Sequence, residues 1–129
     1  MGKMSRDKGA QAERELAGML RGELGDVTRN LNQTRDGGCD LLGCGPWAIE
    51  VKREEKLSLR KWWQQACDQA DRERLMPALA YRQNHRPWQF VVPAGALMHS
   101  IPLDGPVAYL EIDGFVTVTR ELISMEGAA

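Results

Sequence analysis

The sequence predicts an α/β fold in which a mixed central β-sheet is flanked by helices. Three patterns carry this prediction: a helical period over residues 5–24, a strand period over 47–52, and a helical segment, 58–76, that lies between that strand and another at 78–82. A strand, a helix and a second strand form a crossover, which makes the two strands parallel. The length of 129 residues fits one domain, residues 1–129.

The first predicted helix begins at Ser5, a candidate N-cap, and ends before a glycine. Its apolar stripe follows the 3.6-residue helical period and consists of Ala12, Leu16, Met19, Leu20 and Leu24. At about 100° per residue Glu13 falls within this stripe, whereas Arg14 points to the opposite side. A carboxylate directed at the core needs a partner, and Arg29 or Arg35 could provide one.

Residues 39–52 predict a β-hairpin. The first strand, residues 39–43, is joined to the second, residues 47–52, by a three-residue turn that contains glycine and proline. Because side chains alternate between the two faces of a strand, Glu50 and Lys52 lie on the same face.

Two carboxylates face each other in this predicted hairpin. Asp40 lies opposite Glu50, and directly opposed Cβ atoms are only about 4.5–5.5 Å apart. Two ionised carboxylates at that separation repel each other unless one is protonated or a cation lies between them. Oxygen ligands without convergent His or Cys favour Mg²⁺ or Mn²⁺ over Zn²⁺. A surface hairpin with an ordinary ion pair is the alternative that these residues leave open.

The helix predicted over residues 58–76 is capped by Ser58. Its apolar face consists of Leu59, Trp62, Trp63, Ala66, Cys67 and Ala70. Because Trp62 and Trp63 lie on this face, a place in the core is favoured for them over stacking on unpaired bases.

The C-terminal part predicts further strands. A strand over 88–92 follows the one at 78–82, and a short helical or irregular piece spans 94–100. A second hairpin is predicted around Asp113-Gly114, with strands over 107–112 and 115–119, and a short final helix over 120–125.

The net charge of −1 gives no general attraction to nucleic acid, but the charges are segregated along the chain. Residues 1–35 carry seven Lys/Arg against five Asp/Glu, and residues 52–86 carry nine against five. Residues 36–51 carry three acids and no base, and residues 87–129 carry one base against five acids. A basic surface can therefore surround an acidic centre, although two solvated helix faces would give the same counts.

The sequence indicates a cytoplasmic protein without a membrane partner. It contains no apolar run long enough for a membrane helix, and its start leads into a charged helix instead of a signal-peptide core. Three cysteines without a secretion signal fit reduced thiols, and none belongs to a paired zinc motif.

Two blocks of sequence together resemble the PD-(D/E)XK nuclease superfamily, and within it the archaeal-type Holliday-junction resolvases. The first block, Lys8-Gly9 followed by Glu13-Arg14-Glu15-Leu16, resembles the N-terminal motif of that branch. The second, Asp40 followed after nine residues by Glu50-Val51-Lys52, resembles the Asp and Glu-x-Lys signature. Cys39 stands where the superfamily often has proline. The resemblance covers roughly residues 6–70.

This resemblance implies a restriction-endonuclease-like core and a Mg²⁺-dependent endodeoxyribonuclease, with Mn²⁺ as a substitute, whose products carry a 5′-phosphate and a 3′-hydroxyl. The implied catalytic residues are Glu13, Asp40, Glu50 and Lys52. The implied metal ligands are Asp40, Glu50, the carbonyl of Val51, and Glu13 directly or through water. The expected DNA contacts are Lys8, Arg14, Arg29 or Arg35, Arg60, Lys61, Gln64 and Gln65.

The expected partners are branched or junction DNA, in DNA recombination and repair, and a second copy of the chain. A four-way junction is resolved by two symmetric cuts, so one active site per chain requires a twofold dimer. Two alternatives remain: a non-catalytic nucleic-acid-binding or assembly module on a nuclease scaffold, and a nuclease of flaps, nicks or single strands.

Overall fold

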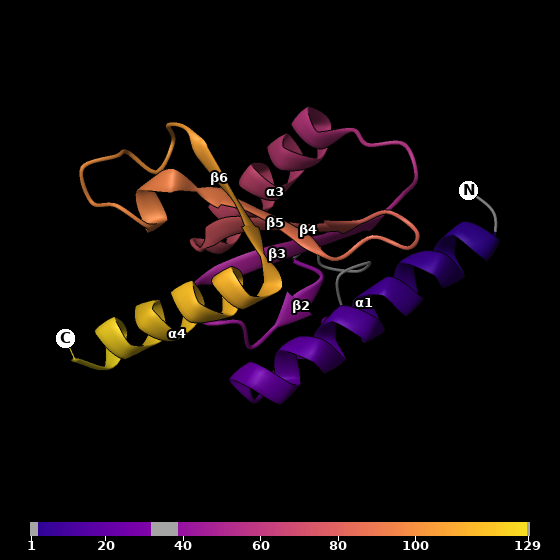
Figure 1. Cartoon of the computed structure of the whole chain (residues 1–129), viewed down its shortest axis with the longest axis horizontal. Coiled ribbons are helices and arrows are strands. Elements are labelled where there is room, and N and C mark those ends of the chain that lie inside the picture. The colour runs from indigo at the N-terminus through magenta and orange to yellow at the C-terminus, as the bar shows by residue number, and fades with distance from the viewer. Residues whose placement is uncertain (1–2, 32–38, 129) are drawn as a thin grey trace.

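The structure is a computed structural model that describes residues 3–31 and 39–128. Within these residues a sheet is combined with helices on both of its faces (Figure 1). The helices are α1 (Lys3–Leu24), α3 (Leu59–Glu73), the 3₁₀ helix η1 (Ala94–Ala96) and α4 (Ile112–Ala128). The strands are β1 (Thr28–Arg29), β2 (Leu41–Leu42), β3 (Trp47–Arg53), β4 (Met76–Arg82), β5 (Gln89–Pro93) and β6 (Val107–Glu111).

The sheet is mixed, as the sequence predicts. Its strands follow the order β1-β2-β3-β4-β5-β6, in which β3 and β4 are parallel and the other described pairs are antiparallel. Helix α3 connects the two parallel strands and is the predicted crossover.

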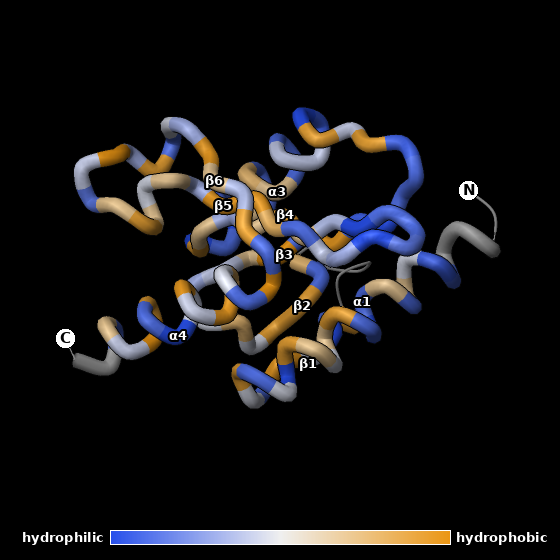
Figure 2. The backbone as a smooth tube through the Cα atoms, in the orientation of Figure 1, coloured by the Kyte–Doolittle hydropathy of each residue, from blue (hydrophilic) through white to orange (hydrophobic). Residues whose placement is uncertain are grey.

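The two faces of the sheet carry separate apolar cores. In β3, Trp47, Ile49 and Val51 belong to a core shared with α1 and α4, whereas Ala48 packs with Ala70 of α3. Phe115 of α4 contributes to the first core, where its ring stacks on Phe90 with centroids 4.2 Å apart. Figure 2 shows hydrophobic residues concentrated in the strands between the helices. The strand alternation of β3 therefore sets which helix covers which face.

Helix α1 agrees with the prediction in length and differs in two details. It begins at Lys3, two residues before Ser5, so the prediction of Ser5 as N-cap is wrong. Leu16 and Leu20 are fully buried as predicted, but Met19 is 43% exposed and does not belong to the stripe. Ala17, outside the predicted stripe, is buried instead, so the buried face is rotated toward Glu13 and Ala17 relative to the prediction.

The hairpin that contains the two predicted carboxylates is present in the predicted register. Leu41 of β2 pairs with Ile49 of β3, and continuing this register by one residue places Asp40 opposite Glu50. Strand β2 ends at Leu42 because Gly43 has a φ of +83°, a left-handed conformation in which the strand cannot continue.

Strand β1 has no counterpart in the sequence prediction. It consists of Thr28 and Arg29, which pair with Leu42 and Leu41 of β2. A strand of two residues has no period to detect, so only its pairing with β2 reveals it.

The prediction of a hairpin over residues 107–119 is wrong. Only its first part forms a strand, β6, and Ile112 begins the helix α4, which also contains the predicted final helix. Phe115, Val116 and Thr119 are buried, and their spacing is that of a helix face. The Asp113-Gly114 pair lies in the first turn, where an acidic residue is favourable.

Helix α3 is shorter than the predicted segment, and Ser58 is its N-cap residue without a capping side-chain hydrogen bond. Trp62 is buried and Trp63 packs partly buried against the same core, so the predicted core role of both is confirmed. None of the described helices is long and apolar enough to cross a membrane.

Candidate active site

The carboxylate of Asp40 is fixed between β2 and β3. The backbone N–H of Asp40 donates to the carbonyl of Ile49 at 2.8 Å, and Oδ2 of Asp40 accepts from the backbone N–H of Val51 at 2.7 Å. At the start of β2 the Asp40 side chain therefore accepts from the N–H of Val51 in the place of a backbone carbonyl. This bond occupies Oδ2 and leaves Oδ1 available to a cation.

Asn30, the residue after β1, holds the same segment from the other side. Its backbone N–H donates to the carbonyl of Asp40 at 3.0 Å, and its Nδ2 donates to the carbonyl of Cys39, also at 3.0 Å. The short pairing of β1 with β2 therefore fixes the backbone that carries Asp40.

Glu13 reaches this region from α1 and is 8% exposed, which confirms its predicted direction toward the core. Its Oε1 accepts from Nε of Arg29 and lies 3.2 Å from the Nη2 atom of the same guanidinium. One of the two predicted ion-pair partners of Glu13 is therefore present. The other, Arg35, lies outside the described residues.

The charges of the site act on one another. Burial and the neighbouring Glu50 carboxylate raise the pKa of Asp40 above its usual range, against the opposing effects of the Val51 N–H and of Lys52. Burial also raises the pKa of Glu50, while the cation of Lys52 lowers it and Glu13 raises it. The predicted set of Glu13, Asp40, Glu50 and Lys52 is therefore brought within mutual electrostatic reach.

Glu73 is a fourth carboxylate at the site that the sequence prediction missed. It ends α3, and its Oε1 accepts from the backbone N–H of Cys39 at 3.4 Å. Its negative charge contributes to the raised pKa of Glu50. Its Oε2 is buried without a hydrogen-bond partner among the described residues. The sequence pattern that could have found Glu73 is its helical spacing from the buried residues Ala66 and Ala70, because this spacing puts Glu73 on the side of α3 that faces the sheet.

The donor chemistry of the site fits a hard divalent cation. Asp40 and Glu50 provide carboxylate oxygens whose mutual repulsion a cation would relieve. Among residues 3–31 and 39–128 no group of three His, Cys, Asp or Glu side chains is arranged to hold one ion. Mg²⁺ is commonly bound through one or two carboxylates together with waters and substrate phosphates, so the two facing carboxylates are a sufficient protein contribution.

A family model described as "Phage putative PDDEXK endonuclease" matches residues 4–121, which is most of the chain and includes every element from α1 into α4. The chain belongs to this endonuclease family. Nucleases with this signature generally use divalent metal ions, which agrees with the carboxylate oxygens at the site.

The fold of this PDDEXK endonuclease is also similar to a solved structure of Hjc, a Holliday junction resolvase from the archaeal hyperthermophile Archaeoglobus fulgidus. The identity is 17% and the TM-score 0.51, over 85% of this chain and 97% of the other. At this identity the similarity concerns the fold alone. No curated protein sequence matches the chain significantly.

The residues predicted to contact DNA fall into separate groups on this endonuclease. Arg14 is exposed on α1, and Arg29 is engaged by Glu13. The residues at the start of α3 are exposed and line a groove of about 710 Å³, together with Asp68 and others. They are Arg60, Lys61, Gln64 and Gln65.

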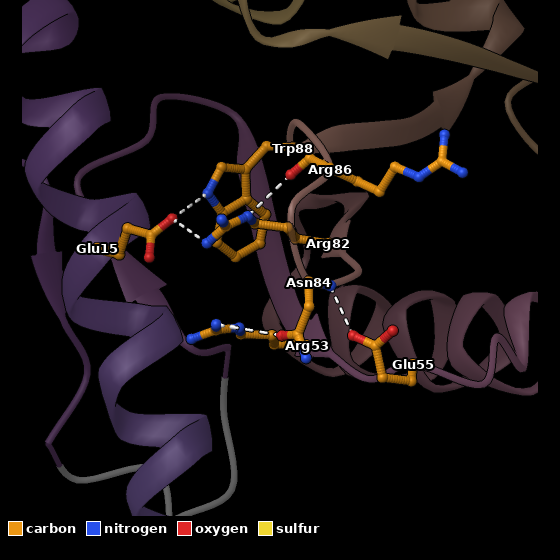
Figure 3. Close-up of polar contacts among 7 residues, drawn as sticks. All are labelled: Glu15, Arg53, Glu55, Arg82, Asn84, Arg86 and Trp88. Atoms are coloured by element: carbon orange, nitrogen blue, oxygen red, sulfur yellow. Dashed lines mark hydrogen bonds and ion pairs between the residues drawn. The ribbon is translucent and has the colours of Figure 1, made fainter.

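The second glutamate of the motif, Glu15, has a structural partner in this endonuclease. Its Oε1 accepts from Nη1 of Arg82 at 2.8 Å and from Nε1 of Trp88 at 2.9 Å (Figure 3). Arg82 in turn donates to the carbonyl of Arg86 at 2.9 Å. Glu15 therefore joins α1 to the turn between β4 and β5, while Glu13 on another side of the helix belongs to the site.

The two buried cysteines, Cys39 and Cys44, have raised thiol pKa values. Burial, together with the nearby Glu73 carboxylate, raises the pKa of the Cys39 thiol to about 12, and burial raises the pKa of the Cys44 thiol to about 12. Both thiols are therefore protonated near neutral pH in the metal-free protein.

Proposed function

We propose that this protein is a metal-dependent DNA endonuclease that hydrolyses phosphodiester bonds with the residue set Glu13, Asp40, Glu50 and Lys52. The observation that carries the proposal is the pair of facing carboxylates, Asp40 and Glu50, with Lys52 two residues along β3, in a chain of an endonuclease family. Branched DNA such as a Holliday junction is the proposed preferred substrate, supported by the resemblance of the two motif blocks.

In this proposal Asp40 and Glu50 would hold Mg²⁺ or Mn²⁺ with the Val51 carbonyl, and Glu13 would bind the ion directly or through water. The chemistry that the ion supplies when bound is polarisation of a phosphoryl oxygen and activation of water. Nζ of Lys52 orients the attacking water and offsets the negative charge that develops on the phosphate. The Val51 N–H keeps the Asp40 carboxylate oriented throughout.

The function is tested by incubating the protein with duplex, flap, single-stranded and four-way-junction DNA in Mg²⁺, Mn²⁺ or EDTA. We expect cleavage with either metal, none in EDTA, and the fastest cleavage on the junction. The 5′ ends of the products should carry phosphate. Metal-dependent cleavage that prefers flaps or single strands would retain the nuclease and change its substrate, whereas cleavage in EDTA would contradict the metal role.

The Glu13–Arg29 ion pair favours one rival, a non-catalytic nucleic-acid-binding module, because an acid that is already neutralised has less need of a metal. Calorimetric titration with Mn²⁺ separates the two. Saturable Mn²⁺ binding that is lost in Asp40→Asn supports the nuclease. Absence of saturable binding, with and without DNA, together with tight DNA binding supports the module.

We further propose that the protein forms a twofold dimer through the end of the sheet at β6. Within the described sheet β6 pairs only with β5, and residues 87–129 carry one base against five acids, which makes this region unsuited to DNA. The η1–β6 segment, β6 and α4 each carry exposed apolar side chains. They are Leu97, Met98, Leu103, Tyr109, Ile123 and Met125.

Light scattering at micromolar concentration should show a mass of roughly twice 14.5 kDa. A stable interface buries about 800 Å² on each partner, so a charge placed within it should dissociate the dimer. We expect Tyr109→Glu and Met125→Glu to be monomeric. Met19→Glu, which changes an exposed methionine on α1, is the control and should remain dimeric. A wild-type protein that is monomeric both alone and with junction DNA would contradict the dimer and favour nicking or flap cleavage.

A further inference from the structure

A polar groove of about 380 Å³ lies outside the candidate active site. It is lined by Asp7, Lys8, Gln11, Arg53 and Asn84. The first three belong to the N-terminal half of α1, Arg53 ends β3, and Asn84 belongs to the turn between β4 and β5. The groove is thus built from three segments that are distant in the sequence.

Arg53 enters the groove with unused hydrogen-bond donors. Its Nη2 donates to Oδ1 of Asn84 at 3.2 Å, and its Nε is buried without a partner among the described residues. A guanidinium carries five N–H donors. A group rich in acceptor oxygens that enters the groove can accept from the remaining N–H groups at the end of the guanidinium.

Two acids of the region around Arg53, Glu15 and Glu55, are engaged by other groups (Figure 3). Glu15 accepts from Arg82 and Trp88, and Oε1 of Glu55 accepts from the backbone N–H of Asn84 at 2.6 Å. In the part of the chain that the structure describes, no carboxylate forms an ion pair with Arg53 or Lys8. Lys8 and Arg53 outnumber Asp7 in the lining, so the groove favours an anion.

The groove and the candidate active site lie on opposite sides of the end of β3. Asp40 approaches from β2, whereas Asn84 follows β4, the neighbour of β3 on the other side. Arg53 directly follows the proposed catalytic residue Lys52. Along α1, Lys8 precedes Glu13 by five residues, which is about 7.5 Å.

We propose that this groove binds a backbone phosphate of the DNA substrate, next to the site of cleavage, through Arg53 and Lys8. The guanidinium provides the directional hydrogen bonds, and Lys8 provides a second positive charge. Phosphate contacts fix the register of a nucleic acid without reading its sequence. The groove therefore sets which phosphate of the strand reaches Asp40, Glu50 and Lys52. This inference rests on the proposed DNA endonuclease function.

The test measures junction-DNA affinity by fluorescence anisotropy over a range of salt concentrations, in an Asp40→Asn background that prevents cleavage. Each lost phosphate contact reduces the slope of log K against log salt by about 0.7–0.9. We expect this reduction, with about 3- to 10-fold weaker binding, for Arg53→Gln and also for Lys8→Gln. Arg53→Lys should retain the slope because it retains the charge. Arg120→Gln is the control, because it removes the same charge from the exposed pair that Arg120 of α4 forms with Glu23 of α1.

The Lys8→Gln variant should fold like the wild type, because Lys8 forms no hydrogen bond within the described residues that the substitution would remove. A weaker affinity of this variant would therefore report on DNA binding and not on misfolding. Unchanged slopes and affinities in both Arg53→Gln and Lys8→Gln would overturn the phosphate site while leaving the nuclease function intact. Failure of the Asp40→Asn protein to bind any DNA would overturn the site and the proposed function together.

Discussion

We expect Asp40→Asn, Glu50→Gln and Lys52→Ala each to reduce metal-dependent DNA cleavage by at least about 10²- to 10³-fold, with little loss of DNA affinity. The first two changes remove the charge that attracts the cation, and the third removes the charge that offsets the phosphate. Asn at position 40 retains an oxygen that can accept from the Val51 N–H, so Asp40→Asn should keep the hairpin intact.

The measurement is the single-turnover cleavage rate on junction DNA with enzyme in excess, together with a separate binding assay. Glu23→Gln is a matched control, because Glu23 is a carboxylate on α1 that pairs with Arg120 at the surface, away from the site. Its rate should equal that of the wild type. A Lys52→Ala or Glu50→Gln protein that cleaves at the wild-type rate would show that the proposed residue set is wrong.

The metal-free wild type should lose stability as the pH rises from 5 to 8.5, and Asp40→Asn should lose less. The folded-state pKa values of Asp40 and Glu50 are raised by burial, with Glu50 also raising that of Asp40. A carboxyl group with a raised folded-state pKa gives its full stabilisation below its unfolded pKa of about 4, and this is lost as the pH rises through the folded value. A tenfold change in proton affinity corresponds to about 1.4 kcal/mol, so we expect a difference of at least about 1–3 kcal/mol between the two proteins.

Divalent metal should reverse this loss. Mn²⁺ or Mg²⁺ binds the ionised carboxylates, so it should raise the melting temperature of the wild type more at pH 8.5 than at pH 5. At 100 times the dissociation constant the stabilisation is about 2.7 kcal/mol. Calorimetric melting curves of wild type and Asp40→Asn, with and without metal, provide the measurement. Parallel pH dependences in the two metal-free proteins, or equal metal effects in both, would contradict a raised pKa of Asp40 as the cause.

Glu73 shows why part of the site could not be found by motif. Asp40 and Glu50 face each other because they belong to one local hairpin. Its register is set by a short turn and by the alternation of side chains along the strand. The position of Glu73 depends instead on how α3 packs across the sheet, which brings its last residue to the N–H of Cys39, 34 positions away. Helical spacing indicates the face of α3 that carries Glu73, but only the packing of α3 against the sheet determines that Glu73 meets Cys39.

In the C-terminal region the sequence contains a helical period, but the turn signal of Asp113-Gly114 led to the prediction of a hairpin. Asp113-Gly114 is a common hairpin turn, and Phe115, Val116 and Val118 favour strands. In the structure Phe115 stacks on Phe90 and lies beside Trp47, and Thr119 accepts from the indole N–H of Trp47 at 2.8 Å. These contacts with two other strands require a helix here, and tertiary packing overrides a weak strand preference.

Features that depend on short-range pattern could be predicted before the structure: helix α1 with Glu13 turned inward, the hairpin that opposes Asp40 to Glu50, and the crossover that makes β3 and β4 parallel. Which charges share a site depends on tertiary packing. It selected Arg29 as a partner of Glu13 and placed Arg53 of β3 beside Asn84. The physical reason is that periodicity fixes the direction of a side chain relative to its own element, whereas its partner depends on how separate elements pack.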